Sequence, residues 1–265
     1  MERAQDDDIV ETFDHGVVTL CLNRPTRLNA ITVPMFESLL ARCERIAADP
    51  DVGALVLAGA GRAFCAGGDI HEMADRAVES PAQAVATLRR RMEIARLLRE
   101  MGKPTIARVQ GPAAGAGFCL ALACDMRIAG PDASFTLAFG RVGYASDYGG
   151  SYFLPKLVGP AKARELYFTN AVVNVPEALA LGIVNRVVPA PSLAAEVDAL
   201  ARSLASGPRV ALAQMKRNLN EADGGSLARV LDTEAEGQIR CRFTEDHREA
   251  ARAFLERRSP VFRGR

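Results

Sequence analysis

The stretch Ala63-Phe64-Cys65-Ala66-Gly67-Gly68-Asp69-Ile70 follows an apolar run at 53–58 that has the composition of a buried strand. Small residues at 66–68 let the backbone approach a ligand closely, because no large side chain stands in the way. A backbone N–H group in such a turn can point at an anion instead of at another strand. An ordinary strand-to-helix turn has a similar composition, so this stretch alone leaves both interpretations open.

A second turn of small residues, Gln110-Gly111-Pro112-Ala113-Ala114-Gly115-Ala116-Gly117-Phe118, follows an expected strand at 105–109. It begins an apolar segment at 115–124 that we expect to form a buried helix. The first N–H groups of a helix have no partner within the helix and carry partial positive charge. Two free N–H groups, one from each turn, are what an oxyanion hole needs, and one such donor lowers a reaction barrier by about 3 kcal/mol.

Length and composition exclude several classes of protein. The chain has 265 residues, of which 49% are hydrophobic, so a packed core is expected. The net charge of +1 gives no indication of a nucleic-acid partner. The six cysteines form no Cys-x-x-Cys pair and the three histidines lie far apart, so we expect reduced thiols in a cytoplasmic protein and no metal site. The polar residues 1–8 are unlike a signal peptide, and no apolar run reaches the roughly 20 residues that span a bilayer.

Hydrophobic periodicity indicates an α/β protein in the first part of the chain. The expected strands lie at 17–23, 53–58, 105–109 and 126–129. The expected helices lie at 32–48, 84–101 and 115–124, with Thr32 as a possible cap. This alternation predicts parallel strands covered by helices.

After Pro189 the sequence predicts helices alone, at 191–206, 208–221 and 226–258. We interpret them as a helical appendage used in oligomerisation. The alternative is that these helices close the same core.

Four motifs in this order resemble those of the enoyl-CoA hydratase/isomerase (crotonase) superfamily over nearly the whole chain. They are Leu22-Asn23-Arg24-Pro25 followed by Leu28-Asn29-Ala30, then 64–70, 111–117 and 179–185. The resemblance implies a ββα spiral core over 1–190 and a C-terminal helical trimerisation region over 191–265. It also implies an acyl-CoA substrate, no cofactor beyond the coenzyme A of that substrate, and a homotrimer or homohexamer. The backbone N–H groups of Gly68 and Ala116 would form the oxyanion hole.

The carboxylates decide which reaction this resemblance implies. Hydratases of the family use two glutamates, and this chain has Cys119 and Phe139 at those positions. Three aspartates are the acids between residues 105 and 164: Asp125, Asp132 and Asp147. For Asp125 we expect a structural role as a cap or as an arginine partner, and Asp132 lies in a turn, where aspartate is common.

Asp147 lies in Gly143-Tyr144-Ala145-Ser146-Asp147-Tyr148-Gly149-Gly150-Ser151, ahead of an expected helix. A helix N-cap is one interpretation. The other comes from resemblance, because isomerases of the phenylacetate-degradation type have a proton-moving aspartate in a similar segment. Dehalogenases of the family use an aspartate here as a nucleophile. They also need an upstream histidine and a tryptophan at position 139, which this chain lacks.

We therefore predict an acyl-CoA thioester isomerase that moves a proton through an enolate, with Asp147 as the base. The alternatives are an enoyl-CoA hydratase or lyase that uses an unrecognised acid, and a non-catalytic acyl-CoA-binding homologue. Four aromatic residues either keep the acyl pocket dry or simply pack the core: Phe118, Phe139, Tyr144 and Tyr148.

The coenzyme A moiety needs cations for its phosphates and polar backbone groups for its adenine. Arg24 and Arg27 lie near the N-terminal signature, and Lys216 resembles a family lysine that reaches the phosphates. By the same resemblance, Ala66, Asp69 and Ile70 offer backbone groups to the adenine. The segment 71–92, and Arg76 to Arg91 in particular, is expected to shape the acyl pocket.

Overall fold

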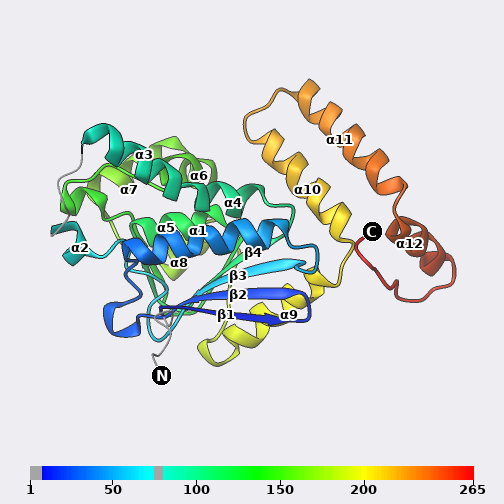
Figure 1. The fold of residues 1–265 in the computed structure, drawn as a ribbon, viewed down its shortest axis with the longest axis horizontal. Coiled ribbons are helices and arrows are strands. Elements are labelled where there is room, and N and C mark those ends of the chain that lie inside the picture. The colour runs from blue at the N-terminus through cyan, green and yellow to red at the C-terminus, as the bar shows by residue number, and fades with distance from the viewer. Residues whose placement is uncertain (1–7, 75–79) are drawn as a thin grey trace.

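The computed structural model describes residues 8–74 and 80–265 (Figure 1). Its main feature is a six-stranded sheet in the order β1-β2-β3-β4-β6-β9. The first pair is antiparallel and the other pairs are parallel. The strands are β1 (Ile9–Asp14), β2 (Val17–Leu22), β3 (Ala54–Gly59), β4 (Thr105–Val109), β6 (Met126–Ala129) and β9 (Arg186–Val187).

The parallel strands match the sequence prediction closely. Every residue of β3 is buried, as expected for a continuous apolar run covered on both faces. The predicted strands at 105–109 and 126–129 are confirmed without change as β4 and β6. Strand β1 was not predicted, because its polar residues give it no apolar run, and it forms an exposed antiparallel edge.

Three helices cover one face of the sheet: α1 (Val33–Ala48), α4 (Glu93–Glu100) and α5 (Ala116–Ala123) (Figure 1). Helix α1 begins as predicted, with the Thr32 hydroxyl accepting a hydrogen bond from the backbone N–H of Met35. The helix predicted at 84–101 is in fact two helices, α3 (Pro81–Arg91) and α4, which meet at Met92. A capping box of Ser80 and Gln83 starts α3 earlier than predicted.

A second, three-stranded sheet has the order β5-β7-β8 and was not predicted. Its strands are β5 (Pro112–Ala114), β7 (Ser134–Thr136) and β8 (Val173–Asn174), each too short to give a hydrophobic period. Helices α6 (Gly150–Val158), α7 (Pro160–Thr169) and α8 (Val175–Ala180) lie close by in the sequence. Shorter helices complete this region: η1 (Pro25–Arg27), α2 (Ile70–Ala74) and η2 (Phe139–Val142).

The other face of the main sheet is covered by α9 (Leu193–Ala205), which follows η3 (Ala190–Ser192) (Figure 1). Val197 and Ala201 of α9 belong to one buried apolar cluster with Val56 and Ile106 of the sheet. Assigning 191–206 to the appendage is therefore wrong, because α9 closes the core. The alternative of the sequence analysis holds for this helix.

Helices α10 (Arg209–Ala222), α11 (Leu227–Arg242) and α12 (Glu245–Leu255) extend away from the sheet (Figure 1). The helix predicted at 226–258 is interrupted before α12, where the Thr244 hydroxyl accepts from the backbone N–H of His247. Within the described residues, no helix is long and apolar enough to cross a membrane.

Candidate active site

The two turns of small residues lie against each other. The backbone N–H of Cys65 donates to the carbonyl of Pro112 at 3.1 Å, and that of Ala114 donates to the carbonyl of Cys65 at 2.8 Å. A Cβ atom at Gly117 would lie 2.6 Å from the Cys65 side chain, so only glycine permits this approach. The start of α5 is thereby fixed beside the first turn.

Two backbone N–H groups face the space between the turns. Gly67 has a φ of +98°, and a Cβ atom there would lie 3.0 Å from the Ala114 carbonyl oxygen and 3.5 Å from the Ala116 nitrogen. Ala116 is the first residue of α5, so its N–H has no partner inside the helix. Among residues 8–74 and 80–265, neither the Gly68 nor the Ala116 N–H donates a hydrogen bond to the protein.

A cavity of about 390 Å³ opens at these two groups. Its wall contains both turns, Leu137, Phe139 and the loop from Tyr144 to Tyr148. Helix α3 adds Leu88 and Arg91, and α1 adds Phe36. The lining is mainly apolar, which suits an acyl chain more than a polar ligand.

Asp147 is the carboxylate in this wall. It is half-buried, and its Oδ1 atom is buried and has no hydrogen-bond partner in the described part of the protein. Burial raises the pKa of Asp147 to about 7. The N-cap interpretation is wrong, because Gly149 occupies the N-cap position of α6 and no side chain caps that helix. A carboxyl with this pKa accepts and releases protons near neutral pH.

The sequence model of the enoyl-CoA hydratase/isomerase family matches residues 12–265. The chain belongs to this family. It is 36% identical over 258 residues to 1,2-epoxyphenylacetyl-CoA isomerase from Escherichia coli, an alignment that covers 97% of this chain and 98% of the relative. It is 33% identical to crotonyl-CoA hydratase from Syntrophomonas wolfei, with the same coverage.

Solved structures give the same result for the fold. The enoyl-CoA hydratase from Bacillus anthracis superposes with a TM-score of 0.90 at 30% identity, covering 97% of this chain and 100% of that one. The predicted fold, an α/β protein of the crotonase type, is confirmed, as is membership of a family of enzymes. The relatives include both isomerases and hydratases by name, so the reaction depends on this enzyme's own residues.

Of the two positions at which we expected glutamates in a hydratase, one lines the cavity and the other is buried in α5. Phe139 lines the cavity directly. Cys119 is buried in α5, and its Sγ atom lies so close to Gly150 that a Cβ atom there would clash with it. Burial raises the pKa of the Cys119 thiol, so it is neutral at physiological pH. Asp147 is therefore the sole acid in the described wall of the cavity.

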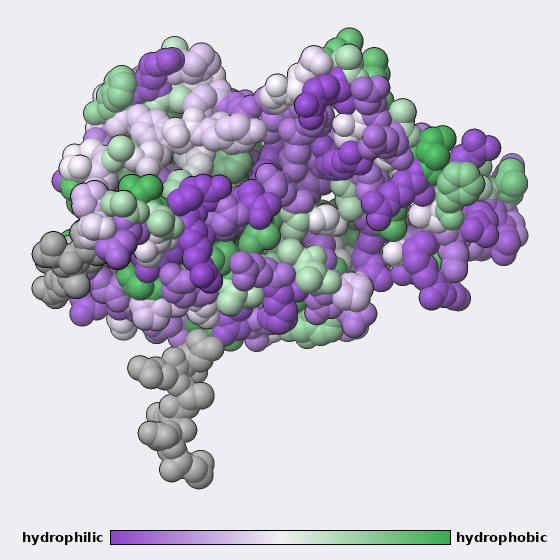
Figure 2. Space-filling view, turned by 45° about the horizontal axis from the view of Figure 1, so that its top comes forward, coloured by the Kyte–Doolittle hydropathy of each residue, from purple (hydrophilic) through white to green (hydrophobic). Residues whose placement is uncertain are grey.

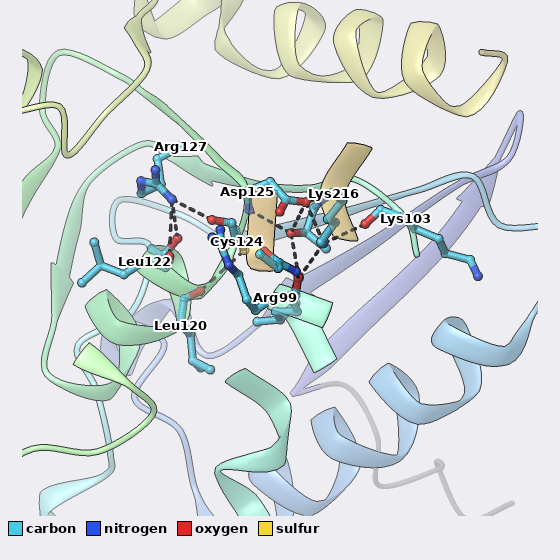
Figure 3. Close-up of polar contacts among 12 residues, drawn as sticks. Arg99, Lys103, Leu120, Leu122, Cys124, Asp125, Arg127 and Lys216 are labelled. Atoms are coloured by element: carbon cyan, nitrogen blue, oxygen red, sulfur yellow. Dashed lines mark hydrogen bonds and ion pairs between the residues drawn. The ribbon is translucent and has the colours of Figure 1, made fainter. Parts of the chain in front are cut away.

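Asp125 and Lys216 lie elsewhere, in a polar cluster in which Lys216 is buried and Asp125 is partly buried (Figure 3). The Lys216 ammonium donates to the carbonyl oxygens of Leu98 and Lys103 and lies 2.7 Å from the Asp125 carboxylate. Three acceptors satisfy all its protons. In this structure the Lys216 ammonium is therefore directed at these three groups and not at the cavity, and its contact with a coenzyme A phosphate stays a prediction. The structural role expected for Asp125 is confirmed, with a lysine in place of an arginine as its partner.

The predicted adenine and phosphate contacts fall into two groups. Arg24 donates from Nη1 to the Asp69 carboxylate at 2.7 Å, and this hydrogen bond lowers the pKa of Asp69. The backbone N–H groups of Ala66 and Asp69 donate to the carbonyls of Leu28 and Ile31, and the contact of these residues' other backbone groups with the adenine stays a prediction. These residues fix the first turn. By contrast, Arg27 is exposed.

Of the other site residues predicted from the sequence, some line the cavity and others do not. Ile70, Tyr144 and Tyr148 line the cavity, and the Tyr148 ring stacks on Phe36 with centroids 5.0 Å apart. Phe118 does not line it, because its ring packs on Phe135 in the core. From the segment expected to shape the pocket, Leu88 and Arg91 contribute, while Arg76 lies outside the described residues. Phe36 was missed because its spacing on α1 indicated only a core face.

Proposed function

We propose that this enzyme is an acyl-CoA isomerase that shifts a proton through an enolate, with Asp147 as the base. The observation that carries the proposal is one cavity that holds two free N–H donors and one carboxyl without a hydrogen-bond partner at Oδ1. Two N–H donors and one base form the smallest set of groups that can move a proton next to a thioester. The two glutamates expected of a hydratase are absent.

The reaction starts when the thioester oxygen accepts hydrogen bonds from the Gly68 and Ala116 N–H groups. These donors stabilise negative charge on that oxygen, so the neighbouring carbon loses a proton more readily. Asp147 takes the proton from this carbon and returns it to another carbon of the conjugated system. One carboxyl performs both steps, because a 1,3-proton transfer adds no water. General base catalysis of this kind contributes about 10²–10⁴-fold.

The raised pKa of Asp147, about 7, suits this role. A carboxylate whose protonated form has an ordinary pKa near 4 is a weak base and gives up its proton too readily to hold it during transfer. The apolar wall of the cavity raises the pKa by burial and excludes water from the enolate. The substrate class that we propose is a β,γ-unsaturated or ring-epoxide acyl-CoA, since the Escherichia coli relative is named for an epoxide of phenylacetyl-CoA.

Replacing Asp147 with asparagine tests the proposal. The variant should lose isomerisation of such substrates by at least about 10²-fold and bind acyl-CoA with nearly unchanged affinity. Full turnover by D147N would contradict the assignment. Crotonyl-CoA serves as the comparison substrate, because rapid loss of its enoyl absorbance would instead show a hydratase, as in the Syntrophomonas relative. Tight binding with no turnover of any enoyl or epoxide substrate would show a binding protein.

For the coenzyme A phosphates we propose Arg27, on the exposed side of the first turn, where its guanidinium lies 3.4 Å from His71 Nε2. Arg24 contributes indirectly, by holding Asp69 and with it this turn.

We also propose that helices α10–α12 assemble the enzyme into a homotrimer or homohexamer. The end of the molecule that they form is mostly hydrophilic but has separate hydrophobic patches (Figure 2). The large apolar side chains exposed there include Leu227, Phe243, Phe254 and Leu255. Apolar patches of this kind mark interfaces between chains. Light scattering after size exclusion measures the assembly, and a monomer at micromolar concentration would contradict this proposal.

A further inference from the structure

A second cavity, of about 880 Å³, lies next to the candidate active site between the 144–146 segment and helices α6 and α7. Tyr144, Ala145 and Ser146 line both cavities. The loop that carries Asp147 is therefore a thin wall with a hollow on each side. Its position depends on the few contacts that tie it to the rest of the protein.

One such contact is a hydrogen bond between the hydroxyl groups of Ser146 and Tyr167, 2.9 Å apart. Tyr167 belongs to α7, so the bond joins the loop to a helix on the far side of the second cavity. Gly150 makes room for it, because a Cβ atom there would lie 2.6 Å from the tyrosine oxygen and 3.4 Å from the serine oxygen. The bond is made by the residue directly before Asp147.

We propose that Tyr167 is a positioning residue for Asp147, acting through its hydrogen bond with Ser146. The inference rests on the proposed function, in which Asp147 moves the proton. The bond holds the carboxyl toward the thioester that the Gly68 and Ala116 N–H groups bind. It also keeps the loop closed against water from the second cavity, and this protects the apolar surroundings on which the basicity of Asp147 depends.

The groups around Asp147 indicate that Tyr167 positions Asp147 through a hydrogen bond and does not act as a second base. Burial raises the pKa of Tyr167, and the neighbouring Cys119 and Asp147 raise it further, so Tyr167 remains neutral at physiological pH. Cys119 on α5 is neutral as well. The loop itself contributes Tyr144 and Tyr148, and among the described residues the arginines that line the two cavities are Arg91 on α3 and Arg164 on α7.

The test compares Tyr167→Phe and Ser146→Ala with the wild-type enzyme. Each removes one hydroxyl of the pair and leaves the rest of the wall in place. We expect kcat to fall about 10- to 100-fold in both, with KM changed little, because a displaced base slows the chemistry without weakening binding. We also expect the acid limb of the kcat profile to move to lower pH, because a loosened loop admits water and Asp147 approaches its ordinary pKa of about 4.

Tyr152→Phe is the matched control. It removes the hydroxyl of a half-exposed tyrosine on α6 and should leave kcat and the pH profile unchanged. The double variant of Tyr167 and Ser146 should be no slower than either single variant, because both remove the same bond.

Wild-type kcat and an unmoved acid limb in both single variants, with D147N inactive, would overturn the inference and leave the proposed function intact. Additive losses in the double variant would overturn it too, since the two hydroxyls would then act separately. Should Tyr167→Phe melt at assay temperature, Ser146→Ala decides alone. A fully active D147N would overturn the proposed function and the inference with it.

Discussion

The ammonium of Lys216 lies 2.7 Å from the carboxylate of Asp125, and this pair of a buried lysine and a partly buried aspartate joins α10 to the core. Lys216 belongs to α10, whereas Asp125 follows α5 and also accepts from the backbone N–H and the hydroxyl of Thr105. The pair is the anchor of α10 on the core (Figure 3). Because these contacts occupy the Lys216 ammonium, replacing this residue should lower the stability of the fold and leave ligand binding unchanged.

Replacing Lys216 with alanine should therefore lower the free energy of unfolding by about 1.5–3 kcal/mol, because the partly buried carboxylate keeps its Thr105 hydrogen bonds but loses its charged partner. Chemical denaturation measures the loss. Acyl-CoA affinity of the folded variant should stay at the wild-type value. A stable K216A variant with weakened coenzyme A binding would instead restore the phosphate role expected from sequence.

The partner of Lys216 could not be predicted from the sequence. The motif around it is recognisable, but its partner lies 91 positions away and is defined only by the packing of α10 on the core. The parallel strands, α1 and α5 were predictable because each has its own apolar pattern and its own caps. The small sheet was not, because strands of two or three residues form only when distant segments meet. Helix α9 has the same sequence character as its neighbours, and only tertiary packing shows that it belongs to the core.

The candidate site was predictable to a similar extent. Asp147, Gly68 and Ala116 all line one cavity, because the turns that carry them keep small residues where the backbones approach closely. Tyr167 gave no signal, since a tyrosine in a helix is common and its partner is a serine hydroxyl. Cys119 was identified only as a missing glutamate, and its packing beside Gly150 depends on the contact between α5 and α6.

The raised pKa of Asp147 predicts that this carboxyl lowers the stability of the fold while it supports the proposed activity. A carboxyl whose pKa rises from about 4 in the unfolded chain to about 7 in the folded one binds more protons when folded. Stability therefore falls as pH rises through that window and levels off above it. D147N removes this cost, so it should be more stable than wild type above pH 7 by a few kcal/mol, with the difference shrinking toward pH 4. Thermal melts of both proteins across this range measure it, and a difference that is independent of pH would contradict it.

The same carboxyl should control the pH dependence of the reaction. In the proposed reaction Asp147 must be ionised to take the proton, so kcat should rise with pH through an apparent pKa near 7. Initial rates between about pH 5 and 9 measure this limb. A profile that is flat across neutral pH would show that another step or another group limits the reaction.

Gly67 should be intolerant of a side chain. Its φ of +98° disfavours any other residue, and a Cβ atom would press on the Ala114 carbonyl beside the Ala116 nitrogen. Gly67→Ala should therefore displace the proposed oxyanion donors and lower kcat by about 10²–10³-fold, the usual loss when one donor is removed. Gly224→Ala is the matched control, because a Cβ atom there meets no atom within 4 Å. Equal activity of the two variants would argue against the oxyanion hole.

Substitutions of Arg27 and Arg24 should have different effects, the first on acyl-CoA binding and the second on stability as well. Arg27 is exposed and close to His71, so Arg27→Gln should weaken acyl-CoA binding several-fold, with a smaller effect at high salt because screening reduces the lost attraction. Arg24→Gln breaks the bonds to Asp69 and Ala30, leaves a buried carboxylate unpaired and should lower stability, with binding reduced at all salt concentrations. Calorimetric titration with an acyl-CoA at low and high salt, combined with melting curves, measures both. Should Arg27→Gln bind as tightly as wild type at low salt, the phosphates must contact other cations.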